Sequence, residues 1–147
     1  CIISIFFNSI MMKLYKYFKP FIEMFKGEID GISGLQTLIN ENPGLLIVKM
    51  GASWCGPCKK IQDVANKKMM GLVNTWGNSV NIIEIDIDDS FEVYASLKTK
   101  RIVNGIPAIL CWFKGNTELR PSEFINDSNP DGVSLLFDKC NVYLKSI

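Results

Sequence analysis

The sequence predicts an α/β fold, with a central mixed β-sheet of four to five strands flanked by helices. Apolar segments of strand length alternate with segments of helical periodicity, a pattern typical of parallel strands joined by helices. Lys114-Gly115-Asn116 then follows an apolar segment as a hairpin-type turn, which adds antiparallel pairing. A chain of 147 residues, 48% hydrophobic and 21% charged, is long enough for one domain with a packed core.

Three segments are expected to form the main strands of this sheet. Leu45–Met50 is almost continuously apolar, as a buried central strand is. Val80–Ile87 alternates between apolar and polar residues, and Ala108–Phe113 is apolar throughout. Two weaker strands are expected, one at Glu28–Gly31 and a return strand near Thr117–Arg120.

Apolar residues at helical spacing predict four helices, at Leu35–Asn40, Cys58–Asn74, Phe91–Lys98 and Val133–Leu144. Asp88-Asp89-Ser90 is expected to cap the third helix, and Asp131 the fourth. Before the last helix, Pro121–Pro130 is expected to form a polar loop.

Residues 1–24 are expected to form an extension outside a single domain that covers residues 25–147. The first 12 residues are apolar but shorter than the roughly 20 needed to span a bilayer, and they lack the basic start of a secretory signal. From Met11 onward, apolar residues recur at helical spacing, with lysines on the opposite face. A helix packed on the domain is favoured over one that associates with a membrane surface or docks a partner. A cytoplasmic location is expected, since no convincing targeting signal is found.

Composition excludes several classes of function. The net charge of +1 and the lack of a basic stripe with interleaved aromatic residues argue against nucleic acid as a partner. The chain contains no histidine, which excludes Cys-His nucleophilic schemes and histidine-based metal sites. The chain has five cysteines but only one Cys-x-x-Cys spacing, which argues against a metal site within the chain. The minor alternative is that Cys55 and Cys58 form half of a metal site that another molecule completes.

Trp54-Cys55-Gly56-Pro57-Cys58 stands between the apolar strand 45–50 and the helix that follows it. Two cysteines at this spacing can cycle between a dithiol and a disulfide. A helix start lowers the pKa of a thiol, because free backbone N–H groups and the helix dipole stabilise the thiolate. Thiol–disulfide exchange is therefore the leading hypothesis, and it needs no cofactor besides the redox-active pair Cys55–Cys58.

The six residues from Trp54 to Lys59 resemble the active-site turn of the thioredoxin family, in the same strand–turn–helix context. Ile106-Pro107, which precedes an apolar strand, is similar to the cis-proline step of that family. The resemblance covers about residues 25–147 and implies the thioredoxin-like fold.

Carried over by position, the resemblance implies that Cys55 is the exposed nucleophile, which attacks a substrate disulfide to give a mixed disulfide. Cys58 is then the more buried thiol that resolves this bond. Gly56 and Pro57 constrain the turn so that the two sulfurs meet, and Trp54 shields one side of it.

The resemblance also implies a substrate-binding role for the Ile106-Pro107 step. A cis Pro107 packs beside the cysteines and leaves the backbone of Ile106 free to pair with an extended substrate. Only about 5–6% of X–Pro bonds in folded proteins are cis, so this is a sharp prediction. Lys59 either adds positive charge near the thiolate or is simply solvated.

One departure from the family pattern concerns the position six residues before the first cysteine, where the family has a buried aspartate. This chain has Lys49 there, and Glu84 stands where the family often has the partner lysine on the neighbouring strand. An inverted charge pair beneath Cys58 is expected, in which Glu84 accepts the Cys58 proton and Lys49 favours the thiolate. The alternative is that Lys49 extends outward and Glu84 faces solvent.

Cys111 and Cys140 are interpreted as buried structural thiols rather than redox groups. The leading function is reduction of protein disulfides, with disulfide-containing proteins as substrates and a reductase that recycles the dithiol as a further partner. A disulfide oxidase or isomerase in an oxidising compartment is the alternative enzyme. A binding module whose redox pair is incidental is the alternative of another class.

Overall fold

The computed structural model describes residues 25–147, and the predictions for residues 1–24 lie outside them. Within the described range, four strands form one sheet in the order β2-β1-β3-β4, with the bounds β1 Leu45–Gly51, β2 Val80–Asp86, β3 Ala108–Phe113 and β4 Glu123–Ile125. Strand β1 runs parallel to β2 and antiparallel to β3, which is in turn antiparallel to β4. The predicted mixed sheet is confirmed, with its two most apolar strands, β1 and β3, at the centre.

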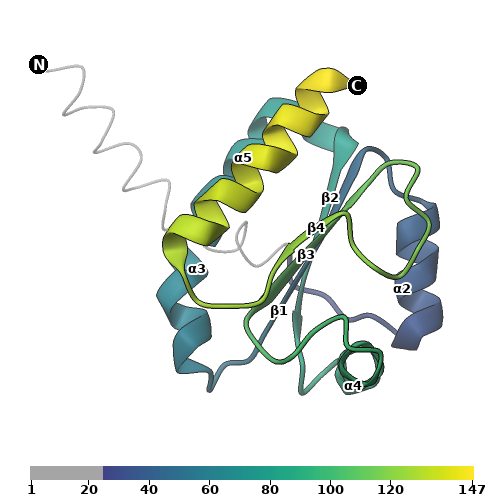
Figure 1. Cartoon of the computed structure of the whole chain (residues 1–147), viewed down its shortest axis with the longest axis vertical. Coiled ribbons are helices and arrows are strands. Elements are labelled where there is room, and N and C mark those ends of the chain that lie inside the picture. Colours follow the sequence, from purple (N-terminus) through teal and green to yellow (C-terminus); the bar gives the residue numbers. More distant parts are fainter. Residues whose placement is uncertain (1–24) are drawn as a thin grey trace, which may run out of the picture.

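Helices cover both faces of the sheet (Figure 1). The long helices α3 (Gly56–Trp76) and α5 (Pro130–Ser146) lie on one face, while α2 (Gly31–Asn40) and α4 (Phe91–Thr99) lie on the other. A 3₁₀ turn, η2 (Gly77–Ser79), links α3 to β2. All four helices start before or at the residue that periodicity predicts, since the first turn of a helix need not be apolar.

The alternation of side chains along β1 divides the core into two clusters. Leu45 and Ile47 point toward α3 and α5, whereas Leu46 and Val48 pack with residues of α2 and α4. All seven residues of β1 are buried. By the same alternation Lys49 points to the α3 side of the sheet, which is the side of the cysteine helix.

The strand predicted at Glu28–Gly31 is wrong. A single bridge joins Lys26 to Glu84. The Ile29 N–H then donates to the Ser90 hydroxyl at 3.0 Å, so this N–H is not used for pairing with the sheet edge. Helix α2 begins immediately afterwards at Gly31, whose φ of +66° suits glycine.

The return strand predicted near Thr117–Arg120 is also misplaced. The Asn116 amide donates to the Arg120 carbonyl at 3.1 Å and to the Ser122 hydroxyl at 3.0 Å, so this segment folds upon itself. Strand β4 therefore forms at Glu123–Ile125, inside the stretch that was expected to be a polar loop.

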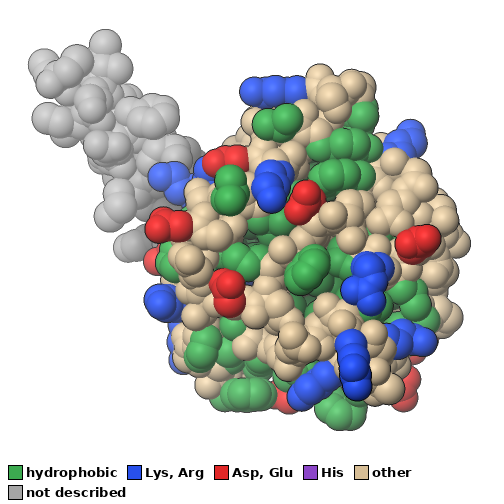
Figure 2. All heavy atoms as spheres, viewed as in Figure 1, with side chains coloured by type: hydrophobic (Ala, Val, Ile, Leu, Met, Phe, Trp, Pro, Cys, Tyr) green, Lys and Arg blue, Asp and Glu red, His purple; other side chains and the backbone are tan. Residues whose placement is uncertain are grey.

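Basic and acidic side chains are both scattered over the face shown in Figure 2. Within residues 25–147, no helix combines the length and apolar character that crossing a membrane requires.

Candidate active site

The Cys55–Cys58 pair forms a disulfide at the start of α3, with Cα atoms 5.3 Å apart. Cys55 is the N-cap residue, and its sulfur accepts a hydrogen bond from the Cys58 backbone N–H at 3.2 Å. Pro57 occupies the first helical turn, where a missing N–H costs nothing. The helix start thus directs a backbone donor at the sulfur of Cys55, the geometry that stabilises a thiolate once the bond is reduced.

The expected contrast between an exposed Cys55 and a more buried Cys58 is not present in this disulfide form. Cys55 is 4% exposed and Cys58 is 6% exposed. Each sulfur covers part of the other while they are bonded. The position of Cys55 at the start of α3 therefore does not by itself expose its sulfur to a substrate.

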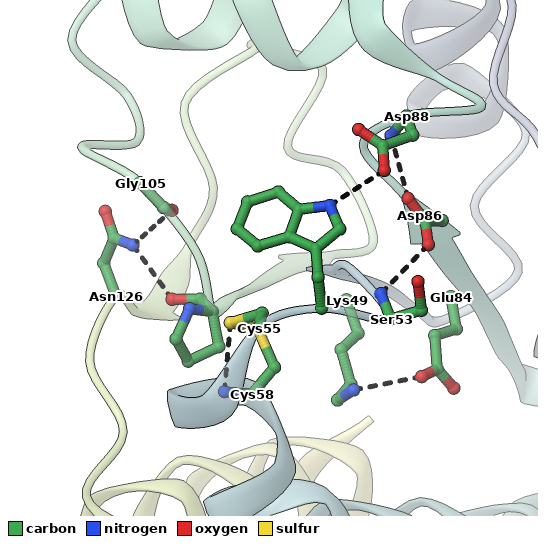
Figure 3. Close-up of a disulfide and its surroundings, with 11 residues drawn as sticks. Lys49, Ser53, Cys55, Cys58, Glu84, Asp86, Asp88, Gly105 and Asn126 are labelled. Carbon is green, nitrogen blue, oxygen red and sulfur yellow. Dashed lines mark hydrogen bonds and ion pairs between the residues drawn. A yellow bond between two sulfur atoms is a disulfide. The ribbon is translucent and has the colours of Figure 1, made fainter.

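Two carboxylates at the end of β2 hold the segment that precedes the cysteines (Figure 3). The Asp86 carboxylate accepts a hydrogen bond from the Ser53 N–H at 3.2 Å. The Trp54 indole N–H donates to the Asp88 carboxylate at 2.9 Å, although the Trp54 side chain is largely exposed. These two bonds tie the loop after β1 to the neighbouring parallel strand.

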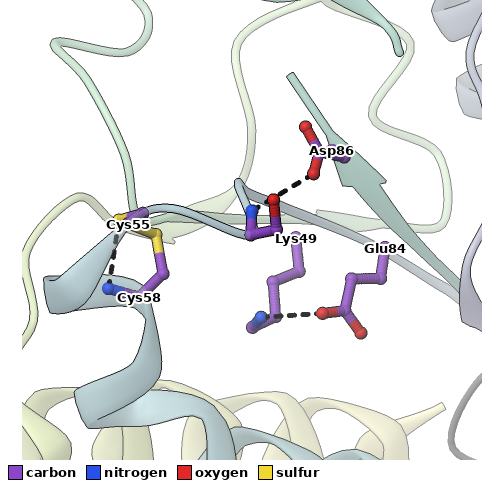
Figure 4. Close-up of polar contacts among 6 residues, drawn as sticks. Lys49, Cys55, Cys58, Glu84 and Asp86 are labelled. Carbon is purple, nitrogen blue, oxygen red and sulfur yellow. Dashed lines mark hydrogen bonds and ion pairs between the residues drawn. A yellow bond between two sulfur atoms is a disulfide. The ribbon is translucent and has the colours of Figure 1, made fainter. Parts of the chain in front are cut away.

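Lys49 and Glu84 form the inverted charge pair that the sequence predicts (Figure 4). They are register partners across β1 and β2, and Lys49 Nζ lies 3.0 Å from Glu84 Oε1. Their side chains are only 4% and 14% exposed, so the alternative in which both reach solvent is wrong. In both close-ups the Lys49 ammonium lies on the side of Glu84 that faces the disulfide.

A cleft of about 430 Å³ connects this charge pair to the disulfide. Its lining includes Cys58, Lys49, Glu84 and Asp86. The cleft passes Gly51, where an added Cβ would lie 3.5 Å from Cys58 Sγ. Cys58 and the Lys49–Glu84 pair thus line the same polar cleft.

The Ile106–Pro107 peptide bond is cis, which confirms the prediction for this step. Asn126, just after β4, donates hydrogen bonds to the carbonyls of Gly105 at 2.8 Å and of Pro107 at 3.0 Å. In Figure 3 this loop lies next to the disulfide, on the opposite side from Lys49. The site thus has a polar cleft on one side and the proline loop on the other.

A family model described as Thioredoxin matches residues 33–131, more than half of the 147-residue chain. The chain belongs to the thioredoxin family. The family match and the Cys55–Cys58 disulfide together indicate a redox-active pair of the thiol–disulfide oxidoreductase type.

Curated thioredoxin-family relatives match about half of the chain. Rabbit (Oryctolagus cuniculus) thioredoxin is 31% identical over 74 residues, which cover 50% of this chain and 66% of the rabbit protein. NADPH-dependent thioredoxin reductase 3 of Arabidopsis thaliana is 30% identical over 63 residues, which cover 43% of this chain but only 11% of the reductase. The chain therefore spans just under two thirds of the rabbit thioredoxin and about a tenth of the plant protein.

Solved thioredoxins share the fold. The oxidised form of mitochondrial thioredoxin 3 from Saccharomyces cerevisiae aligns with a TM-score of 0.59 at 20% identity, covering 80% of this chain and 98% of that one. Trichomonas vaginalis thioredoxin aligns with a TM-score of 0.57 at 21% identity, covering 78% and 94%. The thioredoxin-like fold predicted from the motif is thus confirmed.

Three residues of this thioredoxin-family site were missed in the sequence: Asp86, Asp88 and Asn126. The first two carried a usable signal, because they end a strand predicted to run parallel to the strand before the cysteines. Asp88 was instead assigned to a helix cap. Ser90 is the N-cap of α4, but its hydroxyl accepts from Ile29 and makes no cap hydrogen bond.

The remaining motif residues lie at the surface of the turn. Lys59 is exposed in the first turn of α3. An added Cβ at Gly56 would meet nothing within 4 Å, so the described neighbours do not demand glycine there. No group of three or more cysteine or carboxylate side chains in residues 25–147 is placed to hold a metal ion.

Cys111 and Cys140 are free and buried, as expected. They lie on β3 and α5 in the cluster beneath α3. A hydrogen bond with Cys140, together with burial, raises the pKa of the Cys111 thiol well above its ordinary value. The Cys111 thiol is therefore held in its protonated, unreactive form.

Proposed function

We propose that this protein reduces disulfide bonds of other proteins through the Cys55–Cys58 couple. The observation that carries the proposal is the placement of this disulfide at the N-terminus of α3, between a polar cleft and the cis-Pro107 loop. A helix start favours the thiolate that such exchange requires. The Gly-Pro spacer, which resembles that of reducing family members, supports reduction over oxidation.

In the proposed reaction, the Cys55 thiolate attacks one sulfur of the substrate disulfide. A bond forms between Cys55 Sγ and that sulfur, and the other substrate sulfur leaves as a thiolate. Cys58 then attacks Cys55 Sγ, which restores the Cys55–Cys58 disulfide and releases the second substrate thiol. Two electrons pass from the protein to the substrate in each cycle. A reductase must supply them again, and a reducing, cytoplasmic setting suits this direction.

Lys49 and Glu84 have complementary roles in the second step. The Lys49 ammonium stabilises negative charge on Cys58, because the two residues line one cleft and the Lys49 side chain is only 4% exposed. Glu84 balances the buried ammonium and accepts the proton that Cys58 loses, directly or through solvent in the cleft. The pair thus supplies a cation that stabilises the thiolate and a carboxylate that accepts its proton, with the signs exchanged between the two strands relative to the family pattern.

Reduction of insulin disulfides with dithiothreitol as electron donor tests the proposal. Wild type is expected to turn over and Cys55→Ser to fall to the uncatalysed rate. Cys140→Ala is the matched control, since it removes a cysteine outside the site. Equal rates for wild type and Cys55→Ser would remove the enzymatic function and favour the binding module.

The direction of the reaction is tested by the reduction potential of the Cys55–Cys58 couple, measured by equilibration with glutathione. A value near the roughly −270 mV of reducing thioredoxins is expected. A value near the roughly −120 mV of a strong disulfide oxidant would instead support the oxidase.

The role of Glu84 is tested by the pH profile of the same assay with Glu84→Gln. Without this acceptor, the rise of activity with pH is expected to move to higher pH, because Cys58 must lose its proton to solvent. Glu123→Gln is the control, since Glu123 pairs with Lys139 at a more exposed site on β4. An unchanged profile for Glu84→Gln, or a shift to lower pH, would contradict proton acceptance by Glu84.

A further inference from the structure

Asn126 makes three hydrogen bonds to the loop that carries the cis proline. Its amide nitrogen donates to the carbonyls of Gly105 and Pro107, at 2.8 and 3.0 Å. Its amide oxygen accepts from the Asn104 N–H at 2.6 Å. One side chain therefore uses both donors and its acceptor to hold three of the four residues 104–107.

The pattern of these bonds omits one residue. In the described part of the chain, neither the N–H nor the C=O of Ile106 has a hydrogen-bond partner. The carbonyls on both sides of Ile106 are held by Asn126, and the Ile106 side chain packs against the core cluster that contains Trp112. The backbone of Ile106 is thus held in place from three directions while its own polar groups stay unpaired.

We propose that Asn126 is a positioning residue that presents the Ile106 backbone to an extended polypeptide substrate. This inference rests on the proposed function and specifies its substrate class. A polypeptide segment beside a disulfide has the N–H and C=O groups that pair with Ile106, as an added strand pairs with a sheet edge. A small disulfide without a peptide backbone gains nothing from this edge. Asn126 therefore distinguishes protein disulfides from small ones.

The amide group is essential to this arrangement. Aspartate has the same shape but cannot donate, and its charge would face the two carbonyls of Gly105 and Pro107. Alanine leaves both carbonyls and the Asn104 N–H without their partner. Asn126→Asp and Asn126→Ala should both let the loop move, and Asn126→Asp should be at least as damaging despite its conserved size.

Asn116 offers a matched control. Its amide also donates two hydrogen bonds, to the Arg120 carbonyl and the Ser122 hydroxyl, and accepts one from the Glu118 N–H. It lies beyond the opposite end of β3 from the proline. Asn116→Ala thus removes the same kind of bonds from a loop outside the site.

The first test compares KM for insulin with kcat/KM for bis(2-hydroxyethyl) disulfide. In Asn126→Asp and Asn126→Ala, KM for insulin should rise about fivefold to tenfold, the effect of losing one or two ordinary hydrogen bonds. The small disulfide should be reduced within about twofold of the wild-type rate, which also shows that the cysteine site is folded. Asn116→Ala should match wild type on both. Equal losses on both substrates, or none on either, would overturn the inference.

A binding measurement separates this inference from the proposed function. The probe is an insulin B-chain peptide with serine in place of cysteine, titrated into the oxidised protein and followed by NMR. Wild type should bind it about fivefold to tenfold more tightly than Asn126→Asp, and methylation of the backbone amides that flank the serine should remove the difference. This result would stand even if no reductase activity were found. Equal affinities for the two proteins would overturn the inference whether or not insulin is reduced.

Discussion

The two cysteine pairs of this chain differ in environment rather than in chemistry. Cys55 and Cys58 stand at a helix start beside a polar cleft and form a disulfide. Cys111 and Cys140 are fully buried between β3 and α5, and both remain free. The pKa of Cys111 is raised by its neighbour thiol and by burial. The same residue type is therefore a redox group in one region and a packing group in the other.

The reactivity of each pair depends on the groups that face its sulfur atoms. A backbone N–H is directed at Cys55, and the Lys49–Glu84 pair shares the cleft of Cys58. Residues of the apolar cluster surround Cys111 instead. Charge is stabilised in the first environment and costs free energy in the second.

The largest expected effect is on alkylation. After reduction, native protein treated with iodoacetamide at pH 7.5 should be modified at Cys55 at least about 10³-fold faster than at Cys111 or Cys140, because the latter react only when the core opens. Mass spectrometry of peptides at successive times gives the rates. Comparable rates at Cys111 and Cys55 would show that the two environments do not separate the reactivity of the two cysteine pairs.

The next effect concerns the Lys49–Glu84 ion pair, which shares the cleft of Cys58. Glu84→Gln should lower the free energy of unfolding by about 3 kcal/mol, since it leaves the Lys49 ammonium buried without its partner. Urea unfolding of the oxidised protein measures it. Glu123→Gln, at the exposed pair with Lys139, should cost no more than about 0.5 kcal/mol. Similar losses for the two variants would show that the cleft is as well solvated as the surface.

A smaller effect is expected from the core pair itself. Cys140→Ala should lower the free energy of unfolding by about 1–2 kcal/mol, since it removes a buried sulfur, while insulin reduction per folded molecule stays unchanged. The measurements are urea unfolding and the insulin assay at matched concentration. Loss of activity in folded Cys140→Ala would give the second pair a redox role.

The smallest effect is on the pH dependence of stability. The pKa of Cys111 is higher in the folded state than in the unfolded chain. The contribution of this thiol to the free energy of unfolding is therefore complete below the unfolded-state pKa and decreases as the pH rises above that value. Between pH 7.5 and 9, the free energy of unfolding should fall more for the oxidised wild type than for Cys111→Ala. The expected difference is below about 1 kcal/mol. Thermal unfolding of both proteins across this range measures the difference. Parallel curves would show that Cys111 does not titrate differently on folding.

Much of the fold could be predicted because it depends on local patterns. The burial of β1 follows from its apolar residues. Helix α3 follows from the helical spacing of the apolar residues that come after Pro57. The Lys49–Glu84 pair was predictable because parallel register places these residues opposite each other. Strand β4 was misplaced because the side chain of Asn116, rather than strand propensity, decides where pairing resumes.

The redox chemistry could be inferred from local sequence, because two cysteines at a helix start need only adjacent residues to meet. The cis bond at Pro107 was expected from the resemblance of Ile106-Pro107 to the cis-proline step of the thioredoxin family, and the structure has it. The contacts by which Asn126 holds the proline loop, 19 and 21 residues away in the chain, became visible only in the folded protein. The tertiary structure also brings Cys111 and Cys140 to face each other. Such partners are chosen by register and packing between distant segments, which a local pattern does not specify.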